Sequence, residues 1–155
     1  MEPRFLLDAM LGSLTRWLRI GGYDTEYRID IMDEDLIEKA RIDERILLTR
    51  DEELAHRSRK QGIESLYLKS VDTTEELREI IKVYQIKLDA SRSRCPICNE
   101  TLDKVSKEKV KGKVPEKTWV YVNDFWECQN CGRIYWKGSH WIKITKTIED
   151  AMKPC

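Results

Sequence analysis

Two cysteine pairs near the C-terminal end constrain the fold of this 155-residue chain more than any other feature. Two residues separate Cys95 from Cys98, and two separate Cys128 from Cys131. A two-residue gap lets both thiolates of a pair reach one tetrahedral ion, and two such pairs complete the four-sulfur shell that zinc prefers. The spacing therefore predicts a small β zinc ribbon, whose closed metal shell holds structure and leaves no position open for catalysis.

Disulfide bonds are the alternative use of these cysteines. The chain begins MEPRFLLDAM, without the charged-then-apolar pattern of a secretion signal, so we expect a reducing cytoplasm and zinc. Residues 99–127, between the pairs, exceed the usual length of about 15–20 residues, and we expect strands there. Cys155, after Pro154, is expected to be a bystander at the chain end.

Charge and composition divide the chain into two predicted domains, residues 1–90 and residues 91–155. The first part carries 15 Lys and Arg against 20 Asp and Glu, whereas the second carries 13 against 8. No segment approaches the roughly 18 apolar residues of a membrane span, so no membrane partner is expected. An acidic body with a basic appendage is typical of a metal-dependent enzyme joined to a module that binds a polyanion, although a solvated lysine-rich loop is a commoner source of such an excess.

The first 90 residues alternate strand-like and helix-like segments. Short apolar strands are expected at 4–8, 23–27, 45–49 and 63–68, and helices at 11–19, 33–40, 52–61 and 74–87. Repeated strand–helix units with short connections predict an α/β fold of three layers with a mostly parallel sheet.

Acidic residues follow the strands of this predicted sheet. Asp8 closes the first strand, Asp51 follows the third, and Asp33 and Asp35 stand where the second connection enters its helix. Ligands of open α/β sheets bind beyond the carboxyl ends of the strands, so these acids should converge there. Carboxylate oxygens select Mg²⁺ or Mn²⁺, which can activate water and stabilise charge on a phosphodiester. The pattern predicts hydrolysis of a nucleic acid backbone.

Each acid also has a purely structural interpretation. Asp8 and Asp51 can cap the helices that follow them, and Asp33 and Asp35 can be ordinary acids in the first turn of a helix. Their joint placement at strand ends favours the functional interpretation.

Six segments carry recognisable motifs: FLLD (5–8), MLGSLTRWLR (10–19), GYDT (22–25), ILLTRD (46–51), RCPICN (94–99) and CQNCGRIYWKGSHW (128–141). Together they resemble the PIN-like ribonuclease domain named after the C-terminal part of the Mut-seven exonuclease. The resemblance implies a PIN-like fold, divalent-metal-dependent ribonuclease activity and a C-terminal zinc ribbon. It maps the acidic site to Asp8 and Asp51 with an acid near 33–35, whereas the fourth acid of such sites is not evident, since Asp72 can equally cap a helix.

Basic and aromatic residues suggest contacts to RNA. Arg16 and Arg19, three apart on the first predicted helix, are expected to hold substrate phosphate, or else to be solvated or salt-bridged. Arg50 has the same two uses, contacting phosphate or neutralising carboxylates. Trp17, between the first two arginines, is expected to pack against the core.

The ribbon ends in a segment that mixes aromatic and basic side chains. Trp136, Lys137 and Lys143 are expected to bind single-stranded RNA, with the ring stacked on a base and the lysines near phosphates. Tyr135 or Trp141 is assigned first to the small core of the ribbon.

The sequence thus predicts an endoribonuclease that uses Mg²⁺ or Mn²⁺ and carries a zinc ribbon as its RNA-binding arm. The alternative is a non-catalytic protein that binds RNA or the ribosome and retains the fold with an incomplete set of acids.

Overall fold

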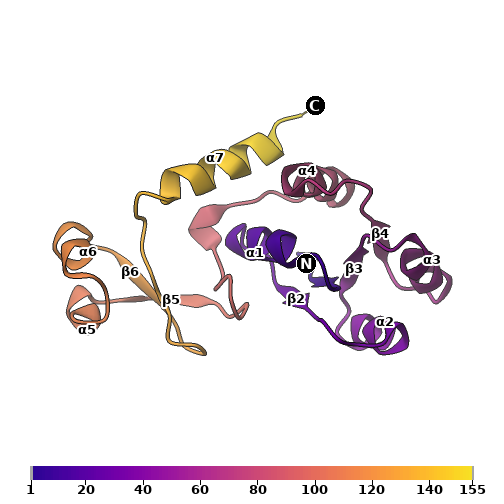
Figure 1. The fold of residues 1–155 in the computed structure, drawn as a ribbon, viewed down its shortest axis with the longest axis horizontal. Coiled ribbons are helices and arrows are strands. Elements are labelled where there is room, and N and C mark those ends of the chain that lie inside the picture. Colours follow the sequence, from indigo (N-terminus) through magenta and orange to yellow (C-terminus); the bar gives the residue numbers. More distant parts are fainter. Residues whose placement is uncertain (1, 155) are drawn as a thin grey trace.

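The computed structural model describes residues 2–154, so Met1 and Cys155, with the bystander role predicted for Cys155, lie outside the described residues. The first part of the chain is an α/β unit with a four-stranded parallel sheet in the order β2-β1-β3-β4 (Figure 1). Its strands are β1 (Phe5–Leu7), β2 (Thr25–Tyr27), β3 (Ile46–Thr49) and β4 (Ser65–Tyr67).

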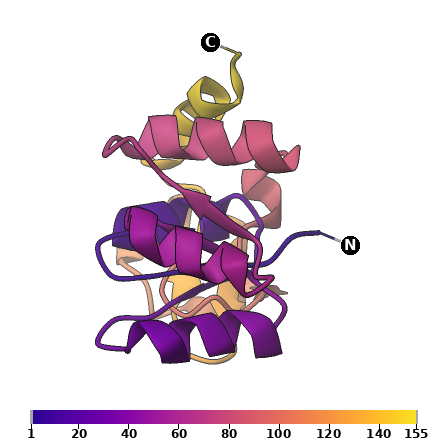
Figure 2. The ribbon, with the colours of Figure 1, turned by 90° about the vertical axis from the view of Figure 1, so that its right-hand side faces the viewer.

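Helices cover both faces of this sheet, because both faces of its central strands are apolar. Phe5 and Leu7 pack with α1 (Gly12–Ile20) and α4 (Thr73–Tyr84), whereas Leu6 packs with α2 (Asp33–Ile42) and α3 (Glu52–Lys60). Figure 2 shows α2 and α4 on opposite sides of the molecule. The predicted fold class is therefore confirmed, and every strand and helix predicted within residues 1–90 is present.

The second part is a small antiparallel sheet in the order β5-β6-β7, which carries the four cysteines. Its strands are β5 (Leu102–Val105), β6 (Phe125–Cys128) and β7 (Ile134–Tyr135). Two short helices, α5 (Lys107–Val110) and α6 (Glu116–Tyr121), connect β5 to β6. The strands expected within residues 99–127 are present as β5 and β6, but the connection between them is helical, where lysine and glutamate, both good helix formers, are frequent.

A last helix, α7 (Trp141–Met152), returns from the ribbon to the α/β unit (Figure 1). Its buried residues Ile148 and Ala151 join the same core cluster as Phe5, and Arg78 of α4 donates to the main-chain oxygen of Asp150 at 2.9 Å. The sequence analysis did not identify this helix. The single-turn helix η1 (Ala90–Arg92) lies between α4 and the first cysteine pair, at the predicted boundary after residue 90.

No helix within residues 2–154 is both long and apolar enough to cross a bilayer.

Candidate functional site

The sheet order places two acids beside its topological switch point. Strand β1 has β2 on one side and β3 on the other, so the helical connections leave the sheet in opposite directions at β1 and β3. Asp8 follows β1 directly, and Asp51 follows β3 by two residues. Open α/β sheets bind their ligands in the crevice that forms there. We call this edge, with Asp8, Asp51 and the neighbouring Asp33, the acidic rim.

Asp8 has one carboxylate oxygen without a partner. Its Oδ2 accepts a hydrogen bond of 2.8 Å from the hydroxyl of Thr49, whereas its Oδ1 is buried and has no hydrogen bond from any residue in the range 2–154. Burial raises the pKa of Asp8. The hydrogen bonds from Thr49 and from the main-chain N–H of Asp8 itself lower this pKa, and the charges of Asp51 and Asp33 raise it further. A buried carboxylate oxygen that accepts no hydrogen bond is stabilised by a proton or a cation beside it.

Thr49 connects the two principal acids. Its hydroxyl donates to Asp8 and accepts from the main-chain N–H of Asp51 at 2.9 Å. The carboxylate of Asp51 accepts from the N–H of Leu54 at 3.1 Å and so caps α3, as the structural interpretation expected. Capping occupies Oδ1, and the side chain is otherwise exposed. The same residue can therefore cap a helix and face a ligand.

The acids near residue 33 lie at different distances from this network. Asp33, in the first turn of α2, is close enough for its charge to act on Asp8, although its Oδ2 lies 3.4 Å from a guanidinium nitrogen of Arg57. Asp35 is exposed on the same helix. Within residues 2–154, only the four cysteines bring three or more potential ligand atoms within 4.8 Å of one another. A cation held by the acidic rim would therefore require side-chain rotation, and hard carboxylate oxygens are the donors that Mg²⁺ and Mn²⁺ accept.

Glu76 is an acid that the sequence analysis missed. It is fully buried on α4, and both of its oxygens accept from Arg50, at 2.9 and 3.0 Å. The hydrogen bonds to Glu76 raise the pKa of Arg50, and the nearby charge of Asp8 raises it further. Of the two uses predicted for Arg50, the structure shows the neutralisation of a carboxylate. Only the fold could reveal this pair, because nothing in the sequence separates Glu76 from the surface glutamates around it.

Asp72, which the sequence analysis considered as a fourth acid or a helix cap, is exposed. It occupies the position before α4, but its side chain makes no capping hydrogen bond.

The two arginines of α1 have different environments. Arg16 is exposed. Arg19 is buried, and its guanidinium donates to the main-chain oxygens of Thr25 at 2.8 Å, Pro96 at 2.9 Å and Ile97 at 3.2 Å. Arg19 therefore attaches the first cysteine loop to the α/β unit and does not join the acidic rim. Trp17 packs against the core, as predicted.

The four cysteines form a compact centre without disulfide bonds. The Sγ atoms of Cys98 and Cys128 are 3.1 Å apart, and those of Cys95 and Cys131 are 3.7 Å apart, whereas a disulfide needs about 2.05 Å. Sulfurs bound at 2.3 Å to one tetrahedral zinc would lie about 3.8 Å from one another. The donor set and its spacing thus fit a zinc ion.

Two thiols of this centre differ in pKa: burial raises the pKa of Cys128 to about 12, whereas Arg133 favours the thiolate form of Cys131. The main chain and side chain of Arg133 donate to Cys131 and lower its pKa to about 6. The hydroxyl of Tyr135 lies 3.1 Å from Sγ of Cys95, and burial raises the pKa of this tyrosine. Tyr135 therefore supports the cysteine centre, in agreement with its predicted place in the ribbon core.

The aromatic and basic residues after the last cysteine lie around the junction of ribbon and α7. Trp136 packs edge-on against the buried ring of Phe125 at a centroid distance of 6.1 Å. Lys137 places its Nζ 5.0 Å from the ring centre of Trp141 and 5.7 Å from that of Trp126. Lys143 is exposed on α7. Trp126, Trp136 and Trp141 are all half-buried at this junction, and the sequence analysis proposed only Trp136 of the three as an RNA contact.

Comparison with protein families finds one match that covers nearly the whole chain. The family model described as the Mut7-C RNAse domain matches residues 3–148. Comparisons with curated proteins and with solved structures find no match.

Proposed function

The chain belongs to the Mut7-C RNase domain family, and from this premise we propose that its acidic rim hydrolyses RNA phosphodiester bonds with Mg²⁺ or Mn²⁺. The observation that carries the proposal is the buried, unpartnered Oδ1 of Asp8, surrounded by the charges of Asp51 and Asp33 at the switch point of the sheet. Carboxylates held together in this way repel one another unless a cation or a proton compensates them. The family supplies the reaction, and the rim is the place where this chain can perform it.

A bound cation would supply Lewis acidity and a water of lowered pKa at this rim. Asp8 and Asp51 would hold it, while Thr49 fixes Asp8 through its hydroxyl and Asp51 through the main chain. Asp33, and to a lesser extent Asp35, would complete the negative surroundings. In the hydrolysis, water adds to phosphorus, the bond to the leaving oxygen breaks, and that oxygen takes up a proton.

The cysteine centre would bind a structural zinc and hold the ribbon in place. Its thiols must be reduced to bind metal, which fits the reducing cytoplasm that we predict. The ribbon would then act as the arm that binds single-stranded RNA, with Trp136, Lys137 and Lys143 as the contacts predicted from the sequence. Arg16, exposed on α1, would contact phosphate between the arm and the rim.

A second candidate is a non-catalytic protein that binds RNA or the ribosome. Two observations favour it: in the described part of the chain no three acids of the rim bring ligand atoms within 4.8 Å of one another, and Glu76 is engaged by Arg50. Both candidates use the same contacts to RNA and differ only in turnover.

Cleavage of single-stranded RNA by the purified full-length protein separates the candidates. We expect cleavage with Mg²⁺ or Mn²⁺, none with EDTA, and loss of activity in Asp8→Asn and Asp51→Asn because each removes a charged ligand. Asp103→Asn is the matched control, since this exposed acid lies on β5 of the ribbon. If Asp51→Asn cleaves at the wild-type rate, the acidic rim is not the active site.

A further inference from the structure

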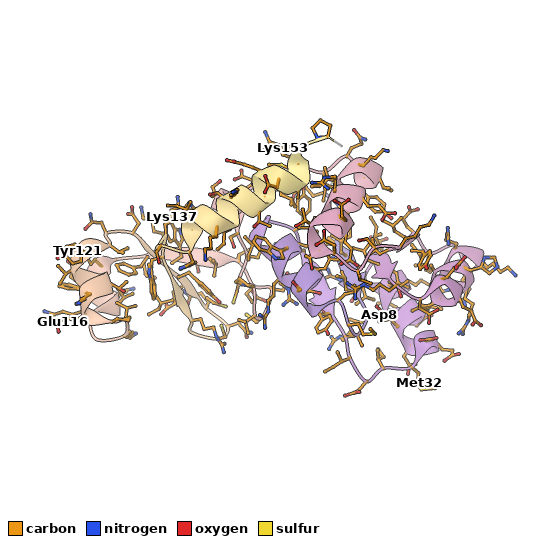
Figure 3. The ribbon with its side chains drawn as sticks, turned by 45° about the horizontal axis from the view of Figure 1, so that its top comes forward. Asp8, Met32, Glu116, Tyr121, Lys137 and Lys153 are labelled. Atoms are coloured by element: carbon orange, nitrogen blue, oxygen red, sulfur yellow. The ribbon has the colours of Figure 1, made fainter. Side chains whose placement is uncertain are left out.

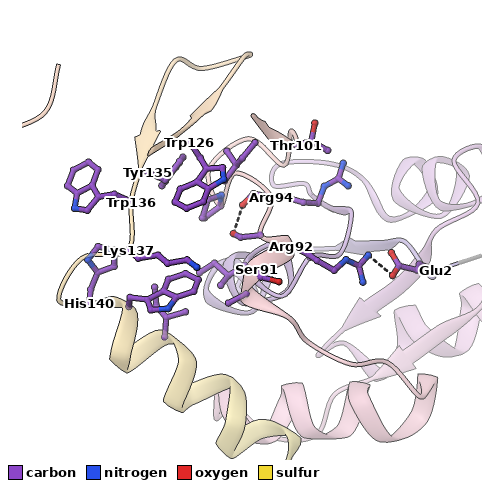
Figure 4. A pocket seen from close by; sticks show the side chains of 18 residues that line it. Glu2, Ser91, Arg92, Arg94, Thr101, Trp126, Tyr135, Trp136, Lys137 and His140 are labelled. Carbon is purple, nitrogen blue, oxygen red and sulfur yellow. Dashed lines mark hydrogen bonds and ion pairs between the residues drawn. The ribbon is translucent and has the colours of Figure 1, made fainter. Parts of the chain in front are cut away.

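A cavity of about 600 Å³ lies where the ribbon, helix η1 and helix α7 meet (Figure 4). Its wall comes from segments far apart in the sequence, including Ile20 of α1, Arg92 of η1, Trp126 of β6 and Trp141 of α7. The cavity therefore exists only when α7 is packed back over the α/β unit. It shares no residue with the acidic rim.

Three tryptophans, Trp126, Trp136 and Trp141, line this cavity, and Lys137 lies against the rings of Trp126 and Trp141. Nζ of Lys137 lies 5.7 Å from the ring centre of Trp126 and 5.0 Å from that of Trp141. Both tryptophans are half-buried, so part of each side chain stays accessible. Such rings stack on unpaired nucleic acid bases regardless of base identity.

The cavity is positively charged. Arg92, Arg94 and Lys137 line it, and the only carboxylate among its lining residues is that of Glu2, which lies 2.6 Å from Arg92. Within residues 2–154, Lys137 forms no salt bridge and is held by the two rings alone. An anionic ligand with a flat apolar part complements this combination, and a nucleotide of an unpaired strand has both properties.

The cavity and the acidic rim lie on opposite edges of the parallel sheet. Glu2 and Gly22 of the cavity precede β1 and β2, whereas Asp8 and Asp51 follow β1 and β3. Strands of three residues separate these edges by about 10 Å or more. In Figure 3, Lys137 and Asp8 are well separated, with α1 between them. A single nucleotide cannot contact both sites.

Helix α1 connects the two sites along one exposed stripe. It begins four residues after Asp8 and ends at Ile20, which lines the cavity, so its nine residues span about 13 Å. Ser13 and Arg16 are exposed, and their spacing to Ile20 places the three residues on one side of the helix. An RNA strand that follows this stripe meets Arg16 between cavity and rim.

We propose that the cavity binds an unpaired nucleotide of the RNA substrate, several nucleotides away from the bond cleaved at the acidic rim. The base stacks against Trp141 and Trp126 and displaces the ammonium group of Lys137, which then contacts the neighbouring phosphate together with Arg92. The substrate is therefore single-stranded RNA long enough to extend along α1 from one edge of the sheet to the other. This inference rests on the proposed ribonuclease function for the placement of the cleaved bond, but not for the binding itself.

Binding is tested without turnover, in EDTA and in the full-length Asp8→Asn protein. Fluorescently labelled single-stranded RNA is titrated with this protein and with versions that also carry Trp141→Ala, Trp126→Ala or Lys137→Glu. Each of these changes should weaken binding of single-stranded RNA by roughly tenfold, because one stacking contact or one phosphate contact is lost. Tyr121→Ala is the aromatic control, since this ring is 82% exposed on α6 and lies outside the cavity.

Zinc content and circular dichroism of each variant establish that the protein is folded. Lys137→Glu is the decisive variant, because its side chain is exposed and supports no core. Unchanged binding by folded Lys137→Glu and by folded Trp141→Ala would overturn the assignment. Equal loss of binding for duplex RNA and single-stranded RNA would also overturn it, since stacking needs an unpaired base.

Single-stranded RNAs of increasing length, given to protein with an unchanged acidic rim, test the distance between the cavity and the rim. Cleavage should rise steeply once the strand is long enough to reach the cavity, and Lys137→Glu should cleave long strands at the rate of short ones. If cleavage does not depend on length, the cavity does not hold the substrate, although the rim remains a nuclease. If no strand is cleaved but the cavity variants lose binding, the nucleotide site stands and the proposed hydrolysis fails.

Discussion

The buried ion pair beside the acidic rim gives the sharpest test of how this protein is stabilised. Glu76 is 0% exposed, whereas its partner Arg50 is 26% exposed, and the two form two hydrogen bonds of 2.9 and 3.0 Å. Because the partners differ in burial, removing one should not cost the same as removing the other. The charge that is left behind determines the loss.

Arg50→Met leaves a carboxylate in the core without a counter-ion, and breaking a buried pair in this way costs about 3–5 kcal/mol. Glu76→Gln leaves a guanidinium that water already reaches in part, so the loss should be nearer 1–2 kcal/mol. For a chain of this length, about 1 kcal/mol corresponds to roughly 2–4 °C in the unfolding midpoint. We therefore expect Arg50→Met to lower the midpoint at least twice as much as Glu76→Gln.

The assay is thermal and urea unfolding followed by circular dichroism at neutral pH, with zinc present and without Mg²⁺ or Mn²⁺. The double variant completes a thermodynamic cycle, and its loss should be smaller than the sum of the single losses because the two groups are in direct contact. Leu54→Ala removes only apolar contacts in the core that Leu6 forms with α2 and α3. It serves as the comparison, because its loss of stability should add to the loss caused by either single variant. Equal losses for the two single variants would refute the reasoning from burial.

Three further predictions concern the rim, the ribbon and α7. Because the pKa of Asp8 is raised in the folded state, ionisation of this side chain opposes folding as the pH rises. Urea unfolding in EDTA should therefore find Asp8→Asn more stable than wild type at pH 7. The difference in stability should disappear below the ordinary carboxyl pKa of 3.8, where Asp8 is protonated in both states. Elemental analysis should find one zinc per chain in wild type and none in Cys128→Ser. Proteolysis of Cys128→Ser should cleave the ribbon while the α/β unit stays folded. Absence of zinc from wild type purified without chelator would contradict this prediction. Ile148→Ala should cost about 2–4 kcal/mol in urea unfolding because this side chain is 4% exposed, whereas Ile142→Ala on the exposed side of α7 should change stability by less than about 0.5 kcal/mol.

Local sequence patterns were sufficient to predict the strands and helices of the α/β unit. The four strands and four helices of residues 1–90 were predicted in the correct order, and the main difference is that α4 ends at Tyr84, where Gln85 adopts a positive φ of 54°, and not at Lys87. The cysteine spacing likewise predicted the cluster that the structure shows. These features depend on periodicity and spacing within short segments, which a sequence displays directly.

Long-range contacts account for what the sequence analysis missed. Arg19 was expected to hold phosphate, yet its donors are directed to Pro96 and Ile97, which are nearly eighty residues away. Tyr135 or Trp141 was assigned to the ribbon core; Tyr135 lies against Cys95, whereas Trp141 begins α7 and lines the cavity. In both cases the side chain had two plausible partners, and only the fold decided between them.

The sequence by itself therefore determined the alternation of strands and helices, the positions of Asp8 and Asp51 at strand ends, and the four-cysteine centre. The tertiary structure decided that α7 packs back onto α4, that Arg50 pairs with Glu76, and that two tryptophans from separate elements share one cavity with Lys137. The physical reason is the range of the interactions. The periodicity of helices and strands depends on residues that are close together in the sequence. The burial of a charge or the shape of a cavity depends on segments that only the folded chain brings together.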